Sequence, residues 1–192
     1  MIKIAVVGDI GSGKSYVAKQ FGYPVFNADK EVANLYRKSK KCYKNLKRKL
    51  PYYITSFPVK KKKLTEAILS NNENLKKINK IVHPLVRESM DIFLKKNKNK
   101  KIVVLDIPLL MENKINKSRY VLVFVDAKRK EIKKRLKKRY NYNPKILKKL
   151  KKLQLPVEKK KKKSNFVIKN NFKHYSIKKN VKKILKKILS NA

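Results

Sequence analysis

Short apolar runs alternate with longer polar stretches along the chain, and these runs lack the every-second-residue pattern of a half-exposed strand. The five runs are residues 2–7, 24–27, 102–106, 120–125 and 166–168. Continuous apolar runs of this length are typical of strands that are covered on both faces, as in a parallel sheet. We therefore predict five buried strands.

Between these runs, apolar residues recur every three or four positions, which is the spacing of one helical face. The pattern predicts helices over residues 15–21, 31–38, 72–95, 131–139, 144–153 and 176–189. Pro84 lies inside the longest of them, and proline lacks the N–H that a helix interior uses but fits a first turn. We therefore predict two helices that meet at His83 and Pro84.

The order of these elements indicates the fold class. Strands that alternate with helices predict an α/β fold with a parallel sheet and helices on both faces. The helical stretch between the second and third strands is too long for a simple crossover, so we expect an inserted helical subdomain. We expect a single domain of residues 1–192, with a core of 1–30, 100–130 and 164–192 and an insertion of about 31–99.

The charge of the chain is extreme, because 55 lysines and arginines face 12 acidic residues and give a formal net charge of +43. One interpretation is a nucleic-acid-binding protein. The other is compositional drift, since the abundant residues have A/T-rich codons. We favour drift, because the excess is spread along the chain, as in the lysine run 159–163, and no aromatic nucleic-acid motif accompanies it. We expect no specific nucleic-acid partner, only weak, salt-sensitive binding of polyanions.

Cysteine usage and hydropathy indicate the compartment. Cys42 is the single cysteine, so no internal disulfide can form, which fits a reducing cytosol. No apolar run approaches the roughly 20 residues that span a bilayer, and the N-terminus resembles a strand rather than a signal peptide. We expect a cytoplasmic protein without a membrane partner, as a monomer or a small homo-oligomer.

Three of the four glycines lie within the stretch GDIGSGKS, residues 8–15. Its spacing, Gly8-x-x-x-x-Gly13-Lys14-Ser15, matches the P-loop pattern, and it stands between a predicted strand and a predicted helix, as that motif requires. Glycines let the backbone N–H groups approach phosphate oxygens closely. We predict that this loop binds ATP, with Lys14 on the β- and γ-phosphates and the Ser15 hydroxyl on Mg²⁺. The predicted ATP contacts in the loop are Gly8, Gly11, Ser12, Gly13, Lys14, Ser15 and Tyr16.

Three acidic residues follow predicted strands, where ligands of an open α/β sheet bind. Asp29 follows the second strand and could accept a proton from an attacking hydroxyl or help to hold Mg²⁺, or it could be a helix N-cap. Asp106 ends the third strand, in the position of a Walker-B acid. Glu112 could be a loop cap or a substrate-side acid.

Two pairs of basic residues are spaced four apart. His83 and Arg87 would share a helical face and could form an anion site, although a lone histidine is more often a core or capping residue. Arg135 and Arg139 would share the face of a later helix and suit a lid over transferring phosphates. The alternative for the arginines is a solvated cationic face.

The ordered set of motifs resembles the dephospho-CoA kinase family. The resemblance runs from the N-terminus to about residue 171 and includes, in order, residues 8–15, 27–29, 83–87, 108–112, Arg135 with Arg139, Gln154, Glu158 with Lys159, and 167–170. The sequences HPLVR at 83–87 and PLLME at 108–112 are more specific than the P-loop. The chain departs from the family pattern at Asp9, Tyr16, Asn27 and the pair Ser164 and Asn165.

This resemblance implies a P-loop kinase that transfers the γ-phosphoryl group of ATP to the ribose 3′-hydroxyl of dephospho-CoA, the final step of coenzyme A biosynthesis. By the same resemblance Asp29 is the proposed base, and the insertion that carries His83 and Arg87 receives dephospho-CoA. Arg135 and Arg139 belong to a lid at about 131–160, Asn170 lies near adenine, and Glu112 contacts the substrate. Two alternatives are another P-loop nucleoside or nucleotide kinase and a nucleic-acid-binding NTPase.

Overall fold

The computed structural model describes residues 1–112, 120–140 and 142–190. Its internal contacts divide the chain into two compact units. The first comprises Met1–Asn27, Asn97–Asn143 and Lys149–Ala192, and the second comprises Ala28–Lys96 and Pro144–Lys148. We call them the sheet unit and the helical unit and describe each by itself.

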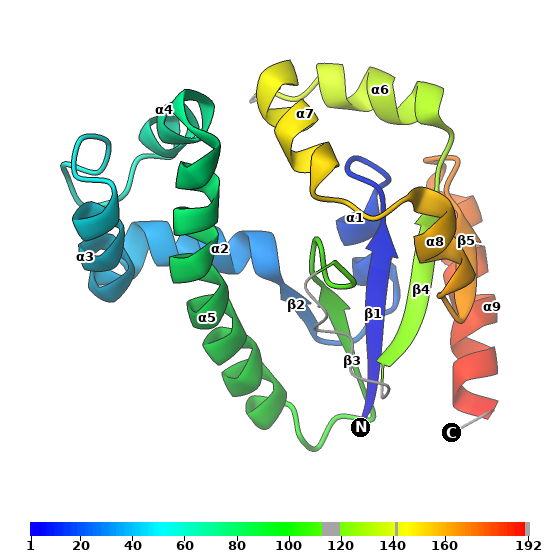
Figure 1. Ribbon diagram of the computed structural model, residues 1–192. Helices are drawn as coiled ribbons and strands as arrows, with labels where there is room; N and C mark the ends of the chain where they lie inside the picture. Colours follow the sequence, from blue (N-terminus) through cyan, green and yellow to red (C-terminus); the bar gives the residue numbers. More distant parts are fainter. Residues whose placement is uncertain (113–119, 141, 191–192) are drawn as a thin grey trace. The chain divides into compact units, whose positions relative to one another are not determined.

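The sheet unit contains a five-stranded sheet of order β2-β3-β1-β4-β5 in which every strand pair is parallel (Figure 1). The strands are β1 (Ile2–Gly8), β2 (Val25–Asn27), β3 (Ile102–Asp106), β4 (Tyr120–Asp126) and β5 (Phe166–Lys169). The predicted parallel sheet is therefore confirmed. The registers place Asn27 opposite Asp106 and Gly8 opposite Val125, so the carboxyl ends of these strands meet at one edge.

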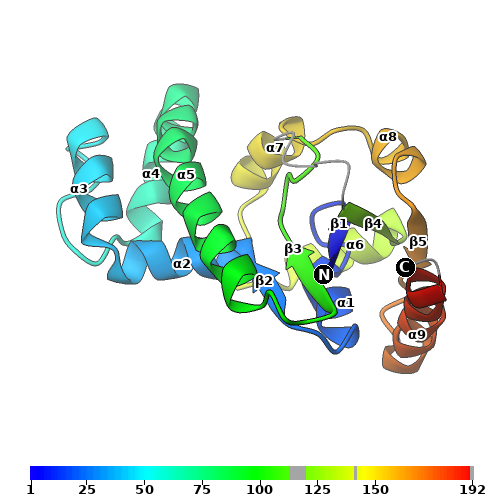
Figure 2. The same ribbon diagram turned by 90° about the horizontal axis from the view of Figure 1, so that it is seen from below.

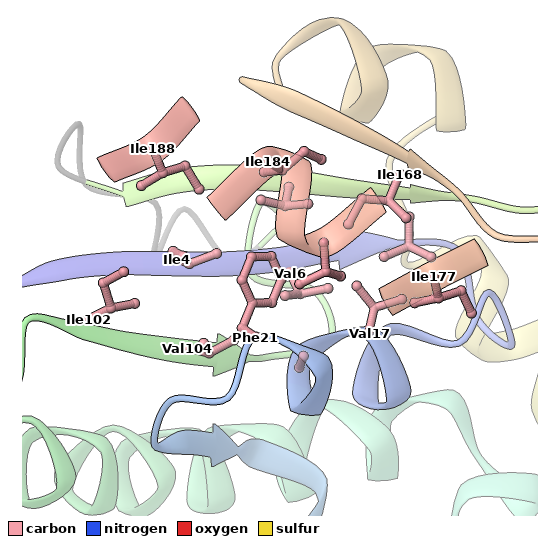
Figure 3. Packing of buried hydrophobic residues seen from close by; sticks show 14 residues of the cluster. Ile4, Val6, Val17, Phe21, Ile102, Val104, Ile168, Ile177, Ile184 and Ile188 are labelled. Atoms are coloured by element: carbon pink, nitrogen blue, oxygen red, sulfur yellow. The ribbon is translucent and has the colours of Figure 1, made fainter. Parts of the chain in front are cut away.

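Helices cover both faces of this sheet. On one face, α1 (Lys14–Gln20) and α9 (His174–Ser190) direct side chains such as Val17 and Ile177 onto Val6 and Ile168 of the strands (Figure 3). On the other face, α8 (Val157–Lys162) contacts β1, and Figure 2 shows it on the side of the sheet opposite α1 and α9. The remaining helices after β4 are α6 (Arg129–Lys137) and α7 (Pro144–Lys152).

The helical unit is built around one long helix. Helix α5 (Asn72–Lys96) contacts α2 (Ala28–Lys38), α3 (Lys40–Lys49) and α4 (Lys61–Ser70) (Figure 1). Its core holds apolar side chains from all four helices, and Ser39 caps α3 by accepting a hydrogen bond from the Cys42 N–H. The sequence analysis did not predict α3 and α4; in α3, six of the ten residues are basic, which leaves few apolar positions to mark a helical face.

The predicted break at Pro84 is wrong, because α5 is a single helix of 25 residues with Pro84 inside it. The apolar side chains of Ile78, Val82 and Leu85, on both sides of the proline, are all buried in the same core. Proline in a helix interior costs about 3 kcal/mol, and each buried large aliphatic side chain contributes about 1.5–3 kcal/mol. Keeping this stripe on one continuous helix therefore outweighs the lost hydrogen bond.

None of the helices in the described part of the chain is long and apolar enough to cross a bilayer.

Candidate active site

The phosphate loop joins β1 to α1 at the carboxyl edge of the sheet. Gly13 precedes α1 with a left-handed backbone, and the Lys14 ammonium donates hydrogen bonds to the carbonyl oxygens of Gly8 (3.3 Å) and Asp9 (2.9 Å). The Asp9 carboxylate accepts the Ile10 N–H at 2.8 Å. The Lys14 side chain therefore folds back over the phosphate loop and bonds to its first two residues.

At each of the three loop glycines a neighbouring protein atom lies too close for a side chain, as Gly11 and Gly13 illustrate. A Cβ at Gly11 would lie 2.9 Å from Leu136 of α6, and one at Gly13 would lie 2.5 Å from the side-chain nitrogen of Asn170. Both residues also have positive φ angles, which side chains disfavour. The sequence analysis explained these glycines by the close approach of phosphate to the backbone, and the structure adds the packing of the loop against α6 and Asn170.

Asn170, which follows β5, supports the phosphate loop through a hydrogen bond to its backbone. It is 3 % exposed, and its amide nitrogen donates to the Ser12 carbonyl oxygen at 2.7 Å, while its amide oxygen accepts the Phe172 N–H at 2.8 Å. Ser12 is itself buried. Both ends of the Asn170 amide are thus used to connect the loop to the turn after β5, and its predicted place near adenine stays a prediction.

Two aromatic contacts lie beside this loop. The Tyr16 hydroxyl and the His174 Nδ1 form a short hydrogen bond, with their rings edge to face. The Arg135 guanidinium lies over the Phe172 ring, 4.4 Å from its centroid. Arg135 therefore stands close to the loop, stacked on an aromatic ring that would lie within 3.5 Å of a Cβ at Gly13.

Arg139 does not share a helical face with Arg135, so that expectation is wrong. Helix α6 ends at Lys137, and Arg139 lies in the following turn, with its N–H bonded to the Leu136 carbonyl. Leu136 is the last apolar residue of α6. Residues 137–139, which follow it, are all basic and carry no apolar side chain to bury. A role of Arg139 toward phosphates stays a prediction.

Oxygen ligands suited to Mg²⁺ stand at the same edge of the sheet. Asp106 is buried at the end of β3 and accepts a hydrogen bond from the Asn27 amide, its partner in the register. Ser15 is exposed in the first turn of α1. Hydroxyl and carboxylate oxygens are the donors that Mg²⁺ prefers, so this set fits the cation that the loop motif implies.

A buried ion pair in the sheet unit was missed by the sequence analysis. The Lys160 ammonium of α8 lies 3.4 Å from the Glu112 carboxylate, and these side chains are 2 % and 9 % exposed. Glu112 also accepts the Leu155 N–H at 3.1 Å, which is the behaviour of a loop cap, and its predicted substrate contact stays a prediction. Both side chains line a small pocket together with Gly8 and Lys14. The available signal was weak: Lys160 follows Val157 by three residues, within a run of five lysines.

The helical unit carries the other candidates. Asp29 is exposed in the first turn of α2, which begins at Ala28, so it is a residue inside the helix rather than its N-cap. His83 is half-buried on α5 and Arg87 is exposed one turn later. Burial, followed by the nearby Arg87 charge, holds the pKa of His83 below its ordinary value of 6.5. This lowered pKa favours the neutral imidazole.

Comparison with known proteins identifies the family. A model of the dephospho-CoA kinase family matches residues 2–175. The chain belongs to this family. The dephospho-CoA kinase of Bartonella henselae is 34 % identical over 193 residues, which cover 98 % of each chain. That of a Wolbachia strain from Brugia malayi is 34 % identical over 170 residues, covering 86 % of this chain and 87 % of the relative.

Solved structures share the fold of this chain. A Thermus thermophilus crystal structure is 28 % identical and superposes with a TM-score of 0.76 over 99 % of this chain and 97 % of that one. The dephospho-CoA kinase of Campylobacter jejuni (21 % identical, TM-score 0.62, covering 97 % and 96 %) shares the fold. So does a shikimate kinase of Acinetobacter baumannii (18 % identical, TM-score 0.56, covering 100 % and 94 %). The P-loop kinase fold and the phosphotransferase class expected from the sequence are confirmed.

Proposed function

We propose that the protein transfers the γ-phosphoryl group of ATP to the ribose 3′-hydroxyl of dephospho-CoA and releases ADP and coenzyme A. The observation that carries the proposal is the phosphate loop at residues 8–15, folded at the carboxyl edge of a parallel sheet in a chain of this family. Phosphoryl transfer needs mainly positioning and electrostatic stabilisation. The sheet unit offers the groups for both.

In this proposal the sheet unit binds the nucleotide. Backbone N–H groups of residues 8–15 and the Lys14 ammonium receive the β- and γ-phosphates, and Asn170 keeps the loop in the receiving shape through its bond to Ser12. The Ser15 hydroxyl and the Asp106 carboxylate hold Mg²⁺, which supplies positive charge to the phosphate oxygens. We infer that Tyr16, Arg135 and Phe172, which lie beside the loop, face the rest of the nucleotide.

The helical unit would receive the acceptor. Asp29 takes the proton of the 3′-hydroxyl while its oxygen attacks the γ-phosphorus and the bond to the β,γ-bridging oxygen breaks. Dephospho-CoA carries a diphosphate, so the paired His83 and Arg87 offer one face of α5 to an anion. The proposed lid function of Arg135 and Arg139 is to neutralise charge on the transferring group.

The test is ADP release in a coupled assay with dephospho-CoA present and absent. The proposal expects release that depends on dephospho-CoA and on Mg²⁺. A nucleoside or nucleotide kinase would instead respond to members of a panel of nucleosides and nucleotides. A nucleic-acid-binding NTPase would respond to added nucleic acid, and tight, sequence-selective binding at physiological salt would favour it over the proposal.

A cytoplasmic location is part of the same proposal, because the single cysteine, Cys42, is a free thiol and a chain without a disulfide fits a reducing compartment.

A further inference from the structure

Lys160 is a buried cation whose N–H donors are not used by the part of the chain that the structure describes. Its side chain is 2 % exposed, and its ammonium has no hydrogen-bond partner within the described ranges 1–112, 120–140 and 142–190. A lysine ammonium carries three N–H donors. Leaving such a group buried without acceptors is costly, because the lost hydration is not replaced.

Glu112 compensates this charge only in part. Its carboxylate oxygen lies 3.4 Å from the Lys160 ammonium, longer than the roughly 2.7–2.9 Å of a strong charge-assisted hydrogen bond. The same oxygen, Oε1, accepts the Leu155 N–H at 3.1 Å. Glu112 therefore holds Lys160 in place as a counter-ion while leaving its donors available.

The pocket around Lys160 is the one that the phosphate loop borders. Its lining includes Gly8 and Lys14 of the loop, with apolar walls from Val7, Ile107 and Leu110. Two lysines thus line one small pocket whose other walls are mainly apolar. Cations that share an environment of low polarity repel each other strongly, and an anion between them removes that repulsion.

We propose that Lys160 is a second phosphoryl-binding cation of this site, which donates to an oxygen of the terminal phosphoryl group of ATP while Glu112 orients it. The inference rests on the proposed function, since it takes ATP as the phosphoryl donor. As that group leaves the bridging oxygen and bonds to the acceptor oxygen, negative charge spreads over its three remaining oxygens. Lys160 stabilises this charge opposite Lys14 and keeps its own protons, because the acceptor proton goes to the base.

The competing role is a purely structural ion pair between Lys160 and Glu112. The two roles predict different effects of a Lys160 substitution on the affinities for ADP and ATP. A structural pair influences ADP and ATP alike, whereas a cation on the terminal phosphoryl group distinguishes them.

The first experiment compares Lys160→Met with Lys162→Met, an exposed lysine of the same helix. Affinities for ADP and for a β,γ-imido analogue of ATP are measured by calorimetry, and kcat by the coupled assay. For Lys160→Met we expect the analogue to bind about tenfold more weakly with ADP binding unchanged, the loss of one charge-assisted hydrogen bond. We expect kcat to fall about 10²-fold, as for other preorganised donors, and Lys162→Met to match the wild type.

A second pair of variants separates this role from stability. Lys160→Met alone leaves the Glu112 carboxylate buried without its counter-ion, and that destabilises the fold. The double variant Glu112→Gln with Lys160→Met removes both charges, so its melting temperature should return toward that of Glu112→Gln. The double variant should bind the ATP analogue no more tightly, relative to ADP, than Lys160→Met does. Glu112→Gln alone, which retains Lys160, should keep the preference for the analogue.

The double variant distinguishes a phosphoryl-binding Lys160 from a structural one. A wild-type preference for the analogue over ADP in the folded double variant, relative to Glu112→Gln alone, overturns the proposal and leaves a structural ion pair. Loss of that preference supports it, even if the wild type fails to use dephospho-CoA. In that last case the acceptor of the proposed function is wrong, while the phosphoryl-binding role of Lys160 stands.

Discussion

The candidate residues of the two units differ in how the protein holds them. In the sheet unit, Lys14, Asn170 and Glu112 each bond to backbone atoms of the site; Asn170 is buried, and the Glu112 side chain is only 9 % exposed. In the helical unit, Asp29 and Arg87 are exposed on the surfaces of α2 and α5. A preorganised site is suited to binding a phosphate at little cost of reorganisation. Exposed side chains contribute less to the packing of the fold.

This difference implies a rule for substitutions. Changes in the buried polar part of the sheet unit should alter both stability and catalysis, because each side chain also supports the fold. Changes at exposed candidates of the helical unit should alter catalysis alone. The predictions below test that rule, beginning with the largest expected effect.

Lys14→Ala should give the largest loss of activity, about 10³-fold or more in kcat, because it removes the cation on the β- and γ-phosphates. The Lys14 ammonium bonds to two carbonyl oxygens of the loop itself, and Lys14 is only half-buried, so the melting temperature should change less than it does for a buried polar residue of the sheet unit. Activity is measured by coupled ADP release and folding by circular dichroism. Retained turnover in a folded variant would contradict the assignment of the ATP site.

Asp29→Asn should lower kcat by about 10²-fold or more, the typical contribution of a general base. Asn keeps the size of the side chain, and Asp29 is exposed, so we expect an unchanged melting temperature and unchanged ATP affinity. The assay is steady-state kinetics with calorimetric ATP binding. A near-normal kcat would show that Asp29 is not the base and would move this assignment to another acid, such as Asp106. The helical unit would then lack an exposed residue whose substitution alters catalysis alone.

Asn170→Ala should change both properties, as the rule requires for the sheet unit. It removes the bond to the Ser12 carbonyl and leaves buried polar atoms unpaired, which costs about 1–3 kcal/mol of unfolding free energy. ATP affinity should fall with it, because the loop loses its support. Urea unfolding and calorimetry measure the two effects. The exposed Asn171→Ala is the matched control, and an equal loss of stability there would break the comparison.

The sequence was sufficient for the parts of the fold that follow from local pattern. All five strands were found, because each is a continuous apolar run between polar segments. The phosphate loop was found from glycine spacing. The Pro84 break was wrong because burial on both sides of the proline is a tertiary effect that helix rules do not contain. The prediction that the helix extends to Arg139 was wrong, because α6 ends at Lys137. A run of lysines and arginines gives no signal for the residue at which a helix ends.

The least predictable features were single side chains within repeated sequence. Residues 159–163 are all lysine, yet only Lys160 is buried, since helical geometry turns that position toward Glu112. Composition cannot select one of five identical residues. The resemblance to the family drew attention to Glu158 and Lys159, whereas the fold buries the next residue.

The smallest expected effect is the pH dependence of stability that comes from His83. Its pKa lies below 6.5 in the folded chain, first because of burial and second because of the Arg87 charge. As the pH falls below about 6.5, the unfolded chain takes up this proton before the folded chain does, so the free energy of unfolding decreases. The contribution is fully present above about 6.5 and is lost as the pH falls through the folded pKa.

His83→Gln should therefore reduce the slope of unfolding free energy against pH below about pH 6.5, measured by urea titration. Arg87→Gln should remove only part of that slope, because burial is the larger cause. NMR titration of the imidazole provides the direct check and separates His83 from His174 by substitution. If Arg87→Gln restored an ordinary His83 pKa, the arginine rather than burial would dominate. His83 would then belong with the surface candidates of the helical unit, where charges act through solvent, and not with the buried groups of the sheet unit.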